Sequence, residues 1–428
     1  MVKKQMLKPC RGMRDFYPND LAFRSWLYQK AREVCQRFGY QEYDGPIVES
    51  LSLYAAKSSE ELIKKQGFTF LSKRDKKILV LRPELTPTLA RMVAAREQEL
   101  IFPLRWWSFG PFFRYESPQK GRGREFYQWN VDILGEDSVN ADAEIIALSC
   151  QFLEGLGFNS DEVVVKINDR KYMNWKMDLI GIPLKKRLAV FRLIDKKGKV
   201  SEDSFMAMLR EVGLSSLQVR DLNLALKDRD YSGESEWLTE LFSALVDLGV
   251  KDWVEFDPTV VRGLDYYTDT VFEAYTREKG VNRALFGGGR YQDLVRDVGG
   301  KRNIGGVGLA AGDMVLEALL ADLGHSPTLS YLPTQVLVTI FDEACFRESI
   351  ELARQLRSWN IATELFFDFR VSLANQLRYA NRKGIPQVVI LGPKEIAEGQ
   401  VVLRNFKTGE QKKIAVHQLR KECGKISL

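Results

Sequence analysis

Histidine is scarce in this chain, because only His325 and His417 occur among 428 residues. Ser-His-Asp triads and multi-histidine metal sites need histidine beside other reactive groups, so this count argues against both classes of site. The five cysteines are scattered and include no C-x-x-C pair, which argues against a zinc finger or a disulfide framework. Unpaired cysteines suit a reducing compartment, and we therefore expect a cytoplasmic protein.

Long apolar runs are also missing. No stretch approaches the ~18 residues that a membrane-spanning helix needs, so we expect no transmembrane helix and no membrane partner. The opening residues, MVKKQMLKPCRGMRDFYP, are basic but lack the apolar stretch of a secretory signal. The chain is nevertheless 45% hydrophobic, so it can bury a core, and its length indicates two or three domains.

The common nucleotide-binding motifs are absent as well. There is no GxxxxGK[ST] loop to hold phosphates. The run GGVGLAAG at 305–312 contains several glycines, but their spacing differs from that of a dinucleotide-binding fingerprint. A nucleotide site in this chain must therefore be of another kind.

Short apolar and aromatic segments separated by turns dominate the first half of the chain. They occur at 46–50, 78–84, 104–116 and 126–135, after an amphipathic helix that starts near Asn19. This texture predicts antiparallel strands rather than βαβ units, and hence an α+β domain over 1–325. The stretch from about 171 to 252 is helical and charged, and strands resume after it, which indicates a helical insertion.

The last part of the chain has a different pattern. Residues 326–333 contain Pro, Ser and Leu and read as a linker, and strands then alternate with helices over 334–428. This alternation predicts an α/β domain. The domain carries 15 Lys and Arg against 10 Asp and Glu, while the whole chain has a net charge of +6. The excess is compatible with an ordinary solvated surface or with a module that docks on phosphates.

Two segments concentrate polar residues in unusual ways. RYESPQKGRGREFYQWNVD places several cations, Arg114 and Arg124 among them, on a glycine-containing hairpin that could hold an anion or could be an ordinary basic hairpin. RGLDYYTDTVFE gathers Arg262, Asp265 and two tyrosines beside a glycine, as a ligand site or as a folded Arg–Asp pair with core tyrosines. LRPELTP, with Glu84, could be a turn with a helix cap.

Taken in order, several segments resemble one known family. RGMRDFYPND is similar to its opening, GYQEYDGPIVES with Pro46 resembles motif 1 of class II aminoacyl-tRNA synthetases, and FRYESPQKGRGREFYQWNVDILG resembles motif 2. RGLDYYTDTVFE and GGGRYQDL resemble the two signatures of the histidyl-tRNA synthetase family. The resemblance spans essentially the whole chain. It implies a catalytic domain of class II synthetase type followed by an anticodon-binding domain.

The resemblance also implies an activity. The family joins histidine to ATP, releases pyrophosphate, and then transfers the histidyl group to the 3′ end of tRNA(His). Arg114 would bind the α-phosphate, and Arg122 with Glu116 would bind the rest of ATP, which carries Mg²⁺; no dedicated metal site is implied. Arg262 would act in catalysis by bridging the histidine carboxylate and the α-phosphate. The family is homodimeric through motif 1, here residues 20–50.

A further set of residues is implied to bind histidine. The ring would meet Asp132 and Tyr267, with Tyr291 nearby, and Asp132 stands where the family usually has glutamate. The α-amino group would meet an acid and two neutral acceptors. Together with Arg262, the implied histidine-binding residues are Glu84, Thr86, Gln128, Asp132, Tyr266, Tyr267 and Tyr291.

One departure from the family concerns motif 3. Val315 stands where the family carries an arginine that covers the adenine and contacts the outer phosphate. The cations that could substitute for it are Arg122, Arg124, Lys301 and Arg302. This loss keeps an alternative open, namely a catalytically silent, synthetase-like regulatory subunit of histidine biosynthesis, although the intact Arg262 signature favours an active enzyme.

Overall fold

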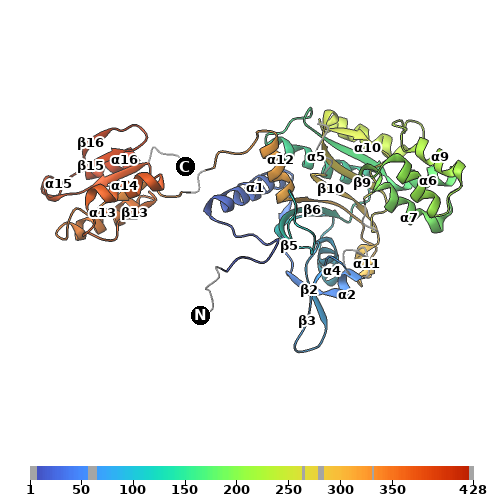
Figure 1. Cartoon of the computed structure of the whole chain (residues 1–428), viewed down its shortest axis with the longest axis horizontal. Helices are drawn as coiled ribbons and strands as arrows, with labels where there is room; N and C mark the ends of the chain where they lie inside the picture. Colours follow the sequence, from blue (N-terminus) through green and yellow to red (C-terminus); the bar gives the residue numbers. More distant parts are fainter. Residues whose placement is uncertain (1–6, 56–64, 263–265, 278–283, 330–331, 424–428) are drawn as a thin grey trace. The chain divides into compact units, whose positions relative to one another are not determined.

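A computed structural model describes residues 7–55, 65–262, 266–277, 284–329 and 332–423. The bulk of the chain packs as two compact units, Phe23–Pro327 and Thr328–Leu428 (Figure 1). Asp265 and part of the predicted linker 326–333 lie outside the described residues.

A large sheet is the framework of the first unit. Its strand order is β1-β5-β6-β11-β10-β9-β7-β8, and its interior pairs are antiparallel, whereas the edge pairs β1–β5 and β7–β8 are parallel. The predicted antiparallel α+β architecture is therefore confirmed. The strands are β1 (Gln41–Glu42), β5 (Leu104–Phe113), β6 (Glu125–Leu134), β7 (Val163–Asp169), β8 (Val254–Phe256), β9 (Thr270–Thr276), β10 (Phe286–Tyr291) and β11 (Gly306–Gly312).

Helices cover one face of this sheet. Leu27 and Val34 of α1 and Ile145 and Phe152 of α5 enter one core with Trp129 of β6. Both α1 and α5 present apolar residues at helical spacing, so burying that stripe against the sheet stabilises each helix. The helices outside the insertion are α1 (Pro18–Arg37), α2 (Leu51–Ala55), α4 (Thr86–Arg96), α5 (Val139–Gly155), α11 (Leu294–Asp297) and α12 (Asp313–Asp322).

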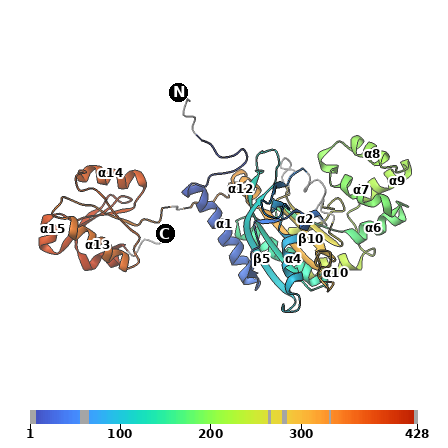
Figure 2. The same cartoon turned by 90° about the horizontal axis from the view of Figure 1, so that it is seen from below.

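Between β7 and β8 the chain forms a helical insertion with a core of its own. Met173, Phe205 and Leu222 are among the fully buried residues of that core. Both views show most of its helices, in green, on the side of the unit away from α1 (Figures 1 and 2). They are α6 (Arg170–Leu179), α7 (Leu184–Ile194), α8 (Glu202–Glu211), α9 (Ser216–Ala225) and α10 (Glu236–Asp247).

A second, three-stranded sheet belongs to the same unit. Its order is β2-β4-β3, formed by β2 (Val48–Ser50), β4 (Ile78–Leu81) and β3 (Phe68–Leu71). Several of its apolar side chains are exposed to solvent in the single chain. These are Val48, Phe70, Leu71 and Ile78.

The second unit is the predicted α/β domain. Its five-stranded sheet has the order β13-β12-β14-β15-β16, with parallel pairs around β12 and antiparallel pairs after β14. The strands are β12 (Val336–Val338), β13 (Thr363–Leu365), β14 (Gln387–Ile390), β15 (Gln400–Asn405) and β16 (Gln411–Ala415). The helices are α13 (Phe346–Ser358), α14 (Leu373–Lys383), α15 (Pro393–Glu398) and α16 (Leu419–Cys423).

All five cysteines are free thiols, and burial raises the pKa of Cys150 to about 12. Cys10 alone among them is exposed. In the described part of the chain, no helix combines the length and the apolar character that crossing a bilayer requires.

Candidate active site

The predicted site residues gather on the face of the large sheet opposite α1 and α5. Side chains alternate along β6, so Gln128 and Asp132 lie on this face while Trp129 and Val131 enter the core on the other. The Oε1 atom of Gln128 is buried and has no hydrogen-bond partner in the described structure. A buried acceptor of this kind costs free energy unless a ligand supplies a donor.

Glycines of β10 and β11 leave room above the sheet. Gly308 pairs with Asp132 on one side and with Gly289 on the other. A Cβ added at Gly308 would lie 2.0 Å from Asp132 Oδ1, and one added at Gly289 would lie 2.8 Å from the Tyr267 ring. Side chains from neighbouring elements occupy this space because the strands themselves have none there.

Asp132 and Tyr291 form a buried pair. The Tyr291 hydroxyl donates a hydrogen bond to Asp132 Oδ1 over 2.8 Å. Burial raises the pKa of Asp132 to about 7, and the hydrogen bond from Tyr291 opposes part of that rise. The carboxyl can therefore change its charge near neutral pH, and an N–H group facing it would favour the ionised form.

Glu84 and Tyr266 form a second buried pair, at the entry to α4. The Tyr266 hydroxyl donates to Glu84 Oε2 over 3.0 Å. Burial raises the pKa of Tyr266 well above its usual range, Glu84 adds to the rise, and a hydrogen bond with Thr86 opposes it. The three predicted residues therefore meet, and Tyr266 also lies against Tyr267 with ring centroids 4.9 Å apart.

Arg114 follows β5 directly and lies beside this cluster. Its Nε donates to the carbonyl of Pro83 over 2.9 Å, and its guanidinium lies 5.2 Å from the Phe126 ring centre. Burial lowers the pKa of Arg114, although the charges of Glu84 and Glu116 act in the opposite direction. A buried cation held in place by backbone and ring contacts is suited to meeting an anionic ligand.

The hairpin between β5 and β6 carries the other predicted ATP ligands. Arg122 Nη1 lies 3.0 Å from Glu116 Oε2, and just over half of the Arg122 side chain is exposed. Arg124 is more constrained, because it donates to the Glu116 carbonyl and lies 3.8 Å from the Tyr115 ring centre. Arg122 is therefore free to exchange its surface ion pair for a phosphate.

Arg262 occupies the loop between β8 and β9, in the left-handed region with φ of 53°. Its Nη1 lies 2.5 Å from Glu273 Oε1 of β9. Burial acts to lower the pKa of Arg262, but the charge and hydrogen bond of Glu273 together with Tyr267 and Tyr266 outweigh it, so the pKa is raised. Gly287 makes room for the guanidinium, since a Cβ there would lie 2.4 Å from Nη1. The Nε of Arg262 is buried without a partner in the described residues.

Lys301 and Arg302 do not join this group. They precede β11, whose first residue Gly306 pairs with Leu134 at the far end of β6. The hairpin begins at the other end of β6, roughly 30 Å away at ~3.4 Å per residue. Both backbone N–H groups donate to Glu97 after α4. As substitutes for the arginine missing at motif 3, these two cations are therefore disfavoured.

Some site residues escaped the sequence analysis. Glu273, which binds Arg262, lies within RGLDYYTDTVFE but had no predicted role. Tyr43 packs on Trp106, the cross-strand partner of Asp132, and its hydroxyl is buried without a partner among the described residues. The glycines within GGGRY and GVGLAAG could have indicated that β10 and β11 leave room above the sheet. Nothing in the sequence indicated Tyr43.

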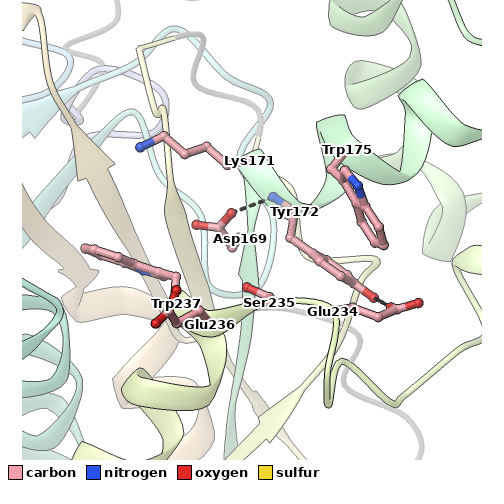
Figure 3. A pocket seen from close by; sticks show the side chains of 8 residues that line it. All are labelled: Asp169, Lys171, Tyr172, Trp175, Glu234, Ser235, Glu236 and Trp237. Carbon is pink, nitrogen blue, oxygen red and sulfur yellow. Dashed lines mark hydrogen bonds between the residues drawn. The ribbon is translucent and has the colours of Figure 1, made fainter.

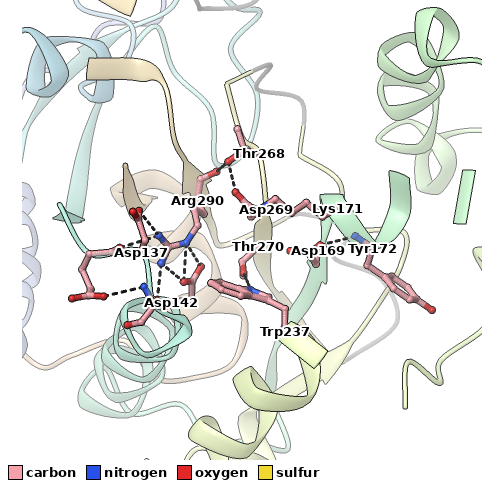
Figure 4. Close-up of polar contacts among 12 residues, drawn as sticks. Asp137, Asp142, Asp169, Lys171, Tyr172, Trp237, Thr268, Asp269, Thr270 and Arg290 are labelled. Atoms are coloured by element: carbon pink, nitrogen blue, oxygen red, sulfur yellow. Dashed lines mark hydrogen bonds and ion pairs between the residues drawn. The ribbon is translucent and has the colours of Figure 1, made fainter. Parts of the chain in front are cut away.

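A polar network lies between the site and the insertion (Figure 4). Arg290 of β10 is fully buried and paired with Asp142 of α5, with Nε 2.9 Å from Oδ2. On β9 and the loop before it, Thr270 accepts from Trp237 Nε1 over 2.8 Å, and Asp269 pairs with Lys171 of α6. The network joins β10, α5, β9 and the insertion by fixed contacts.

A cavity of about 270 Å³ opens at the base of the insertion (Figure 3). It is framed by the junction of β7 with α6 and by the start of α10, and none of the predicted site residues lines it. Its lining residues are Asp169, Lys171, Tyr172, Trp175, Glu234, Ser235, Glu236 and Trp237.

Comparison with known proteins gives consistent matches. The family model described as Histidyl-tRNA synthetase matches residues 12–313, and that described as Anticodon binding domain matches 335–426. The histidine–tRNA ligase of Leptospira biflexa is 34% identical over 412 residues, covering 94% of this chain and 93% of the relative.

Solved structures share the fold. Histidyl-tRNA synthetase from Nostoc sp. PCC 7120 matches with a TM-score of 0.81 at 24% identity, covering 98% of this chain and 99% of that one. A Bacillus halodurans protein described as an ATP phosphoribosyltransferase regulatory subunit/histidyl-tRNA synthetase gives 0.71 at 26% identity, over 88% and 97%. Since the family model matches well over half of the sequence, the chain belongs to the histidyl-tRNA synthetase family.

Proposed function

We propose that the glycine-lined face of the large sheet binds histidine and ATP and forms histidyl-adenylate. The chain is a histidine–tRNA ligase, and the observation that carries the residue assignments is the meeting of Glu84, Arg114 and Tyr266 on the face that also holds Asp132 and Tyr291. Asp132 accepts the imidazole N–H, and the Tyr267 hydroxyl meets the other ring nitrogen. Glu84, Thr86 and Gln128 receive the ammonium group.

Adenylate formation follows from two cations. A histidine carboxylate oxygen attacks the α-phosphorus, the bond to the bridging oxygen breaks, and pyrophosphate leaves with the electron pair. Negative charge on the phosphate oxygens is met by Arg114, while Arg262 contacts both the carboxylate and the α-phosphate. The unpartnered Nε of Arg262 gives it a donor beyond those used by Glu273.

The hairpin between β5 and β6 would bind the β- and γ-phosphates of ATP. Arg122 leaves Glu116 and binds the β- or γ-phosphate, which carries Mg²⁺. Glu116 would offer a carboxylate, the kind of oxygen ligand that Mg²⁺ takes, and 17% of its side chain is exposed while it pairs with Arg122. Mg²⁺ bound to the phosphates neutralises part of their charge when present.

The second unit binds the anticodon arm of tRNA(His) in this proposal. A cavity of about 520 Å³ on α14 is lined by cations and one tyrosine, a combination suited to phosphates and unstacked bases. Its lining residues are Asn375, Arg378, Tyr379, Arg382 and Lys383. Free thiols throughout the described chain suit the reducing cytoplasm in which tRNA is charged.

A homodimer is proposed from the exposed apolar residues of the small sheet and the segment before it. Ile47 and Val48 of motif 1 are 42% and 40% exposed, and Leu71 and Ile78 are 62% and 51% exposed. An isologous interface would bury these side chains.

Pyrophosphate exchange separates this proposal from a silent regulatory subunit. We expect histidine-dependent exchange of labelled pyrophosphate into ATP and charging of tRNA(His). Arg262→Ala should lower the exchange rate by ~10²–10³ while histidine affinity is largely kept, because the contact strengthens in the transition state. Arg277→Ala, just after β9, is the matched control and should behave as wild type. No exchange by the wild-type chain would support the regulatory alternative.

A further inference from the structure

Arg170, the first residue of α6 in the insertion, reaches into the loop that carries Arg262. The residue is buried, with 5% of its surface exposed. Its Nε donates to the carbonyl of Val261 over 3.1 Å, its Nη2 to that of Arg262 over 2.8 Å, and its Nη1 to that of Tyr267 over 2.6 Å. One guanidinium therefore joins both ends of the segment that runs from Arg262 to Tyr267.

Arg170 also contacts the core of the insertion and the segment before β9. Its guanidinium lies 5.2 Å from the ring centre of Phe191, a core residue of α7. Its backbone N–H donates to the Asp269 carbonyl over 2.9 Å, and the preceding Asp169 caps α6 by accepting from the Tyr172 N–H over 2.6 Å. Figure 4 shows this junction, with Lys171 directed toward Asp269. The side chain thus links Phe191 of the insertion to the backbone carbonyls of Arg262 and Tyr267.

The loop needs such support. Arg262 has φ of 53°, a strained conformation for a non-glycine residue that persists only where its surroundings impose it. Hydrogen bonds from a charged donor are stronger than neutral ones, and the planar guanidinium can serve three carbonyls at fixed angles. A lysine has no such fork.

We propose that Arg170 is a positioning residue for adenylate formation. It holds the backbone at Arg262 and Tyr267, so that the Arg262 guanidinium and the Tyr267 hydroxyl stay on the glycine-lined face of the sheet, and it thereby couples the insertion to catalysis. The proposal rests on the proposed role of Arg262. None of the predicted site residues lies in the insertion, so the proposal gives the insertion a role in the reaction that they do not.

The insertion offers a matched control for this proposal. Arg187 of α7 is also buried and donates to the backbone carbonyls of Ile182 and Asn174, over 3.1 and 3.2 Å. Among the described residues, the hydrogen-bond partners of Arg187 all lie within the insertion, so Arg187→Met perturbs the insertion without releasing the loop. Arg170→Met removes the three bonds to the loop and keeps an apolar stem of similar length.

The full-length variants are compared by histidine-dependent pyrophosphate exchange and by calorimetric unfolding. Arg170→Met should lower kcat by ~10²-fold, since a displacement of about 1 Å has that effect, while the KM for ATP stays within about twofold of wild type. Arg187→Met should keep kcat, whatever its unfolding temperature. Equal losses of kcat in both variants would overturn the proposal. Arg170→Lys should recover only part of the rate, and full recovery would overturn the need for three directed donors.

A double variant tests whether Arg170 acts through Arg262. Added to Arg262→Ala, Arg170→Met should lower kcat by less than about threefold, because residues that act as a unit are not additive. Independent, multiplicative losses would overturn the proposal. If Arg262→Ala alone retains the wild-type rate, the proposed catalytic role of Arg262 fails; if Arg262→Ala is slow and Arg170→Met is fast, only the positioning role of Arg170 fails.

Discussion

The Tyr291 hydroxyl reaches Asp132 across an intervening strand, with 2.8 Å between the two oxygens. Tyr291 belongs to β10 and Asp132 to β6, and β11 lies between them. The contact exists because β11 has glycines there: a Cβ at Gly306 would lie 2.8 Å from the Tyr291 ring, and one at Gly308 would lie 2.0 Å from Asp132 Oδ1. The Asp132–Tyr291 contact therefore depends on the absence of side chains at Gly306 and Gly308 of β11.

Gly308→Ala should therefore disable histidine binding. The added methyl group must displace the Asp132 carboxylate or shift the strand, and such overpacking costs ~1–3 kcal/mol of stability. We expect the KM for histidine to rise at least ~10-fold while the KM for ATP changes little, as measured by pyrophosphate exchange. Gly155→Ala on α5 is the control, because its added Cβ would meet no described atom within 4 Å beyond its chain neighbours and the backbone of its own helix. Equal histidine KM values in the two variants would contradict the prediction.

Histidine affinity should depend on the charge of Asp132. With a pKa raised to about 7 by burial, the carboxyl of the free enzyme loses its proton near neutrality. The ionised form accepts the ring N–H, so the association constant should rise with pH through about 7. Calorimetric titration from pH 5.5 to 8.5 measures it, and Asp132→Asn should keep only the inflection of histidine itself, at about 6.5. The same inflection in both proteins would exclude Asp132 as its source.

The same raised pKa has a consequence for stability. Between about 4, the unfolded value, and about 7 the folded chain keeps a proton on Asp132 that the unfolded chain has lost. The contribution of this group to the free energy of unfolding should therefore fall as pH rises through that window. Urea unfolding of wild type and Asp132→Asn at pH 5 and pH 8 measures this contribution. The free energy of unfolding of wild type, relative to that of Asp132→Asn, should be lower at pH 8 than at pH 5.

The oligomeric state of the chain tests whether the small sheet forms a dimer interface. The wild-type chain should scatter light at twice the 49.1 kDa of a single chain. Replacing Ile47 and Val48 with Glu should shift the molecule toward a monomer, because charges would have to be buried in the interface. Ile101→Glu is the control, since Ile101 is 88% exposed and lies outside this sheet. A wild-type monomer at micromolar concentration would contradict the proposal.

Arg122 is the cation expected to replace the missing arginine of motif 3. Arg122→Ala should raise the KM for ATP ~10-fold in the exchange assay, as loss of a charge-assisted phosphate contact does. Arg302→Ala, at the other end of β6, should leave it unchanged. The reverse order of effects would move the phosphate site away from the hairpin.

The sequence predicted the architecture because the signals were local. The stripe on α1, the aromatic strands β5 and β6 and the helices after β7 each follow from residue spacing. The partners of site residues depend on strand order instead: Glu273 meets Arg262 across a loop, and Tyr43 approaches Asp132 because β1 lies beside β5. Periodicity contains no information on either relation. For the same reason, the sequence alone did not distinguish Lys301 and Arg302 from Arg122 as substitutes for the missing arginine of motif 3.

The strand order also determines how long β6 remains without one of its partner strands while the chain is being synthesised. One edge of β6 pairs with β5 and the other with β11, which is the last strand of the large sheet to be made. At ~5–20 residues per second, the ribosome needs roughly 10–35 s to extend the nascent chain from β6 to the end of β11. During that interval the strand bearing Gln128 and Asp132 has an open, apolar edge, the kind that recruits other strands and leads to aggregation. Among the strand edges of the large sheet, this edge of β6 therefore waits longest for its partner, and β6 carries two of the residues proposed to bind histidine.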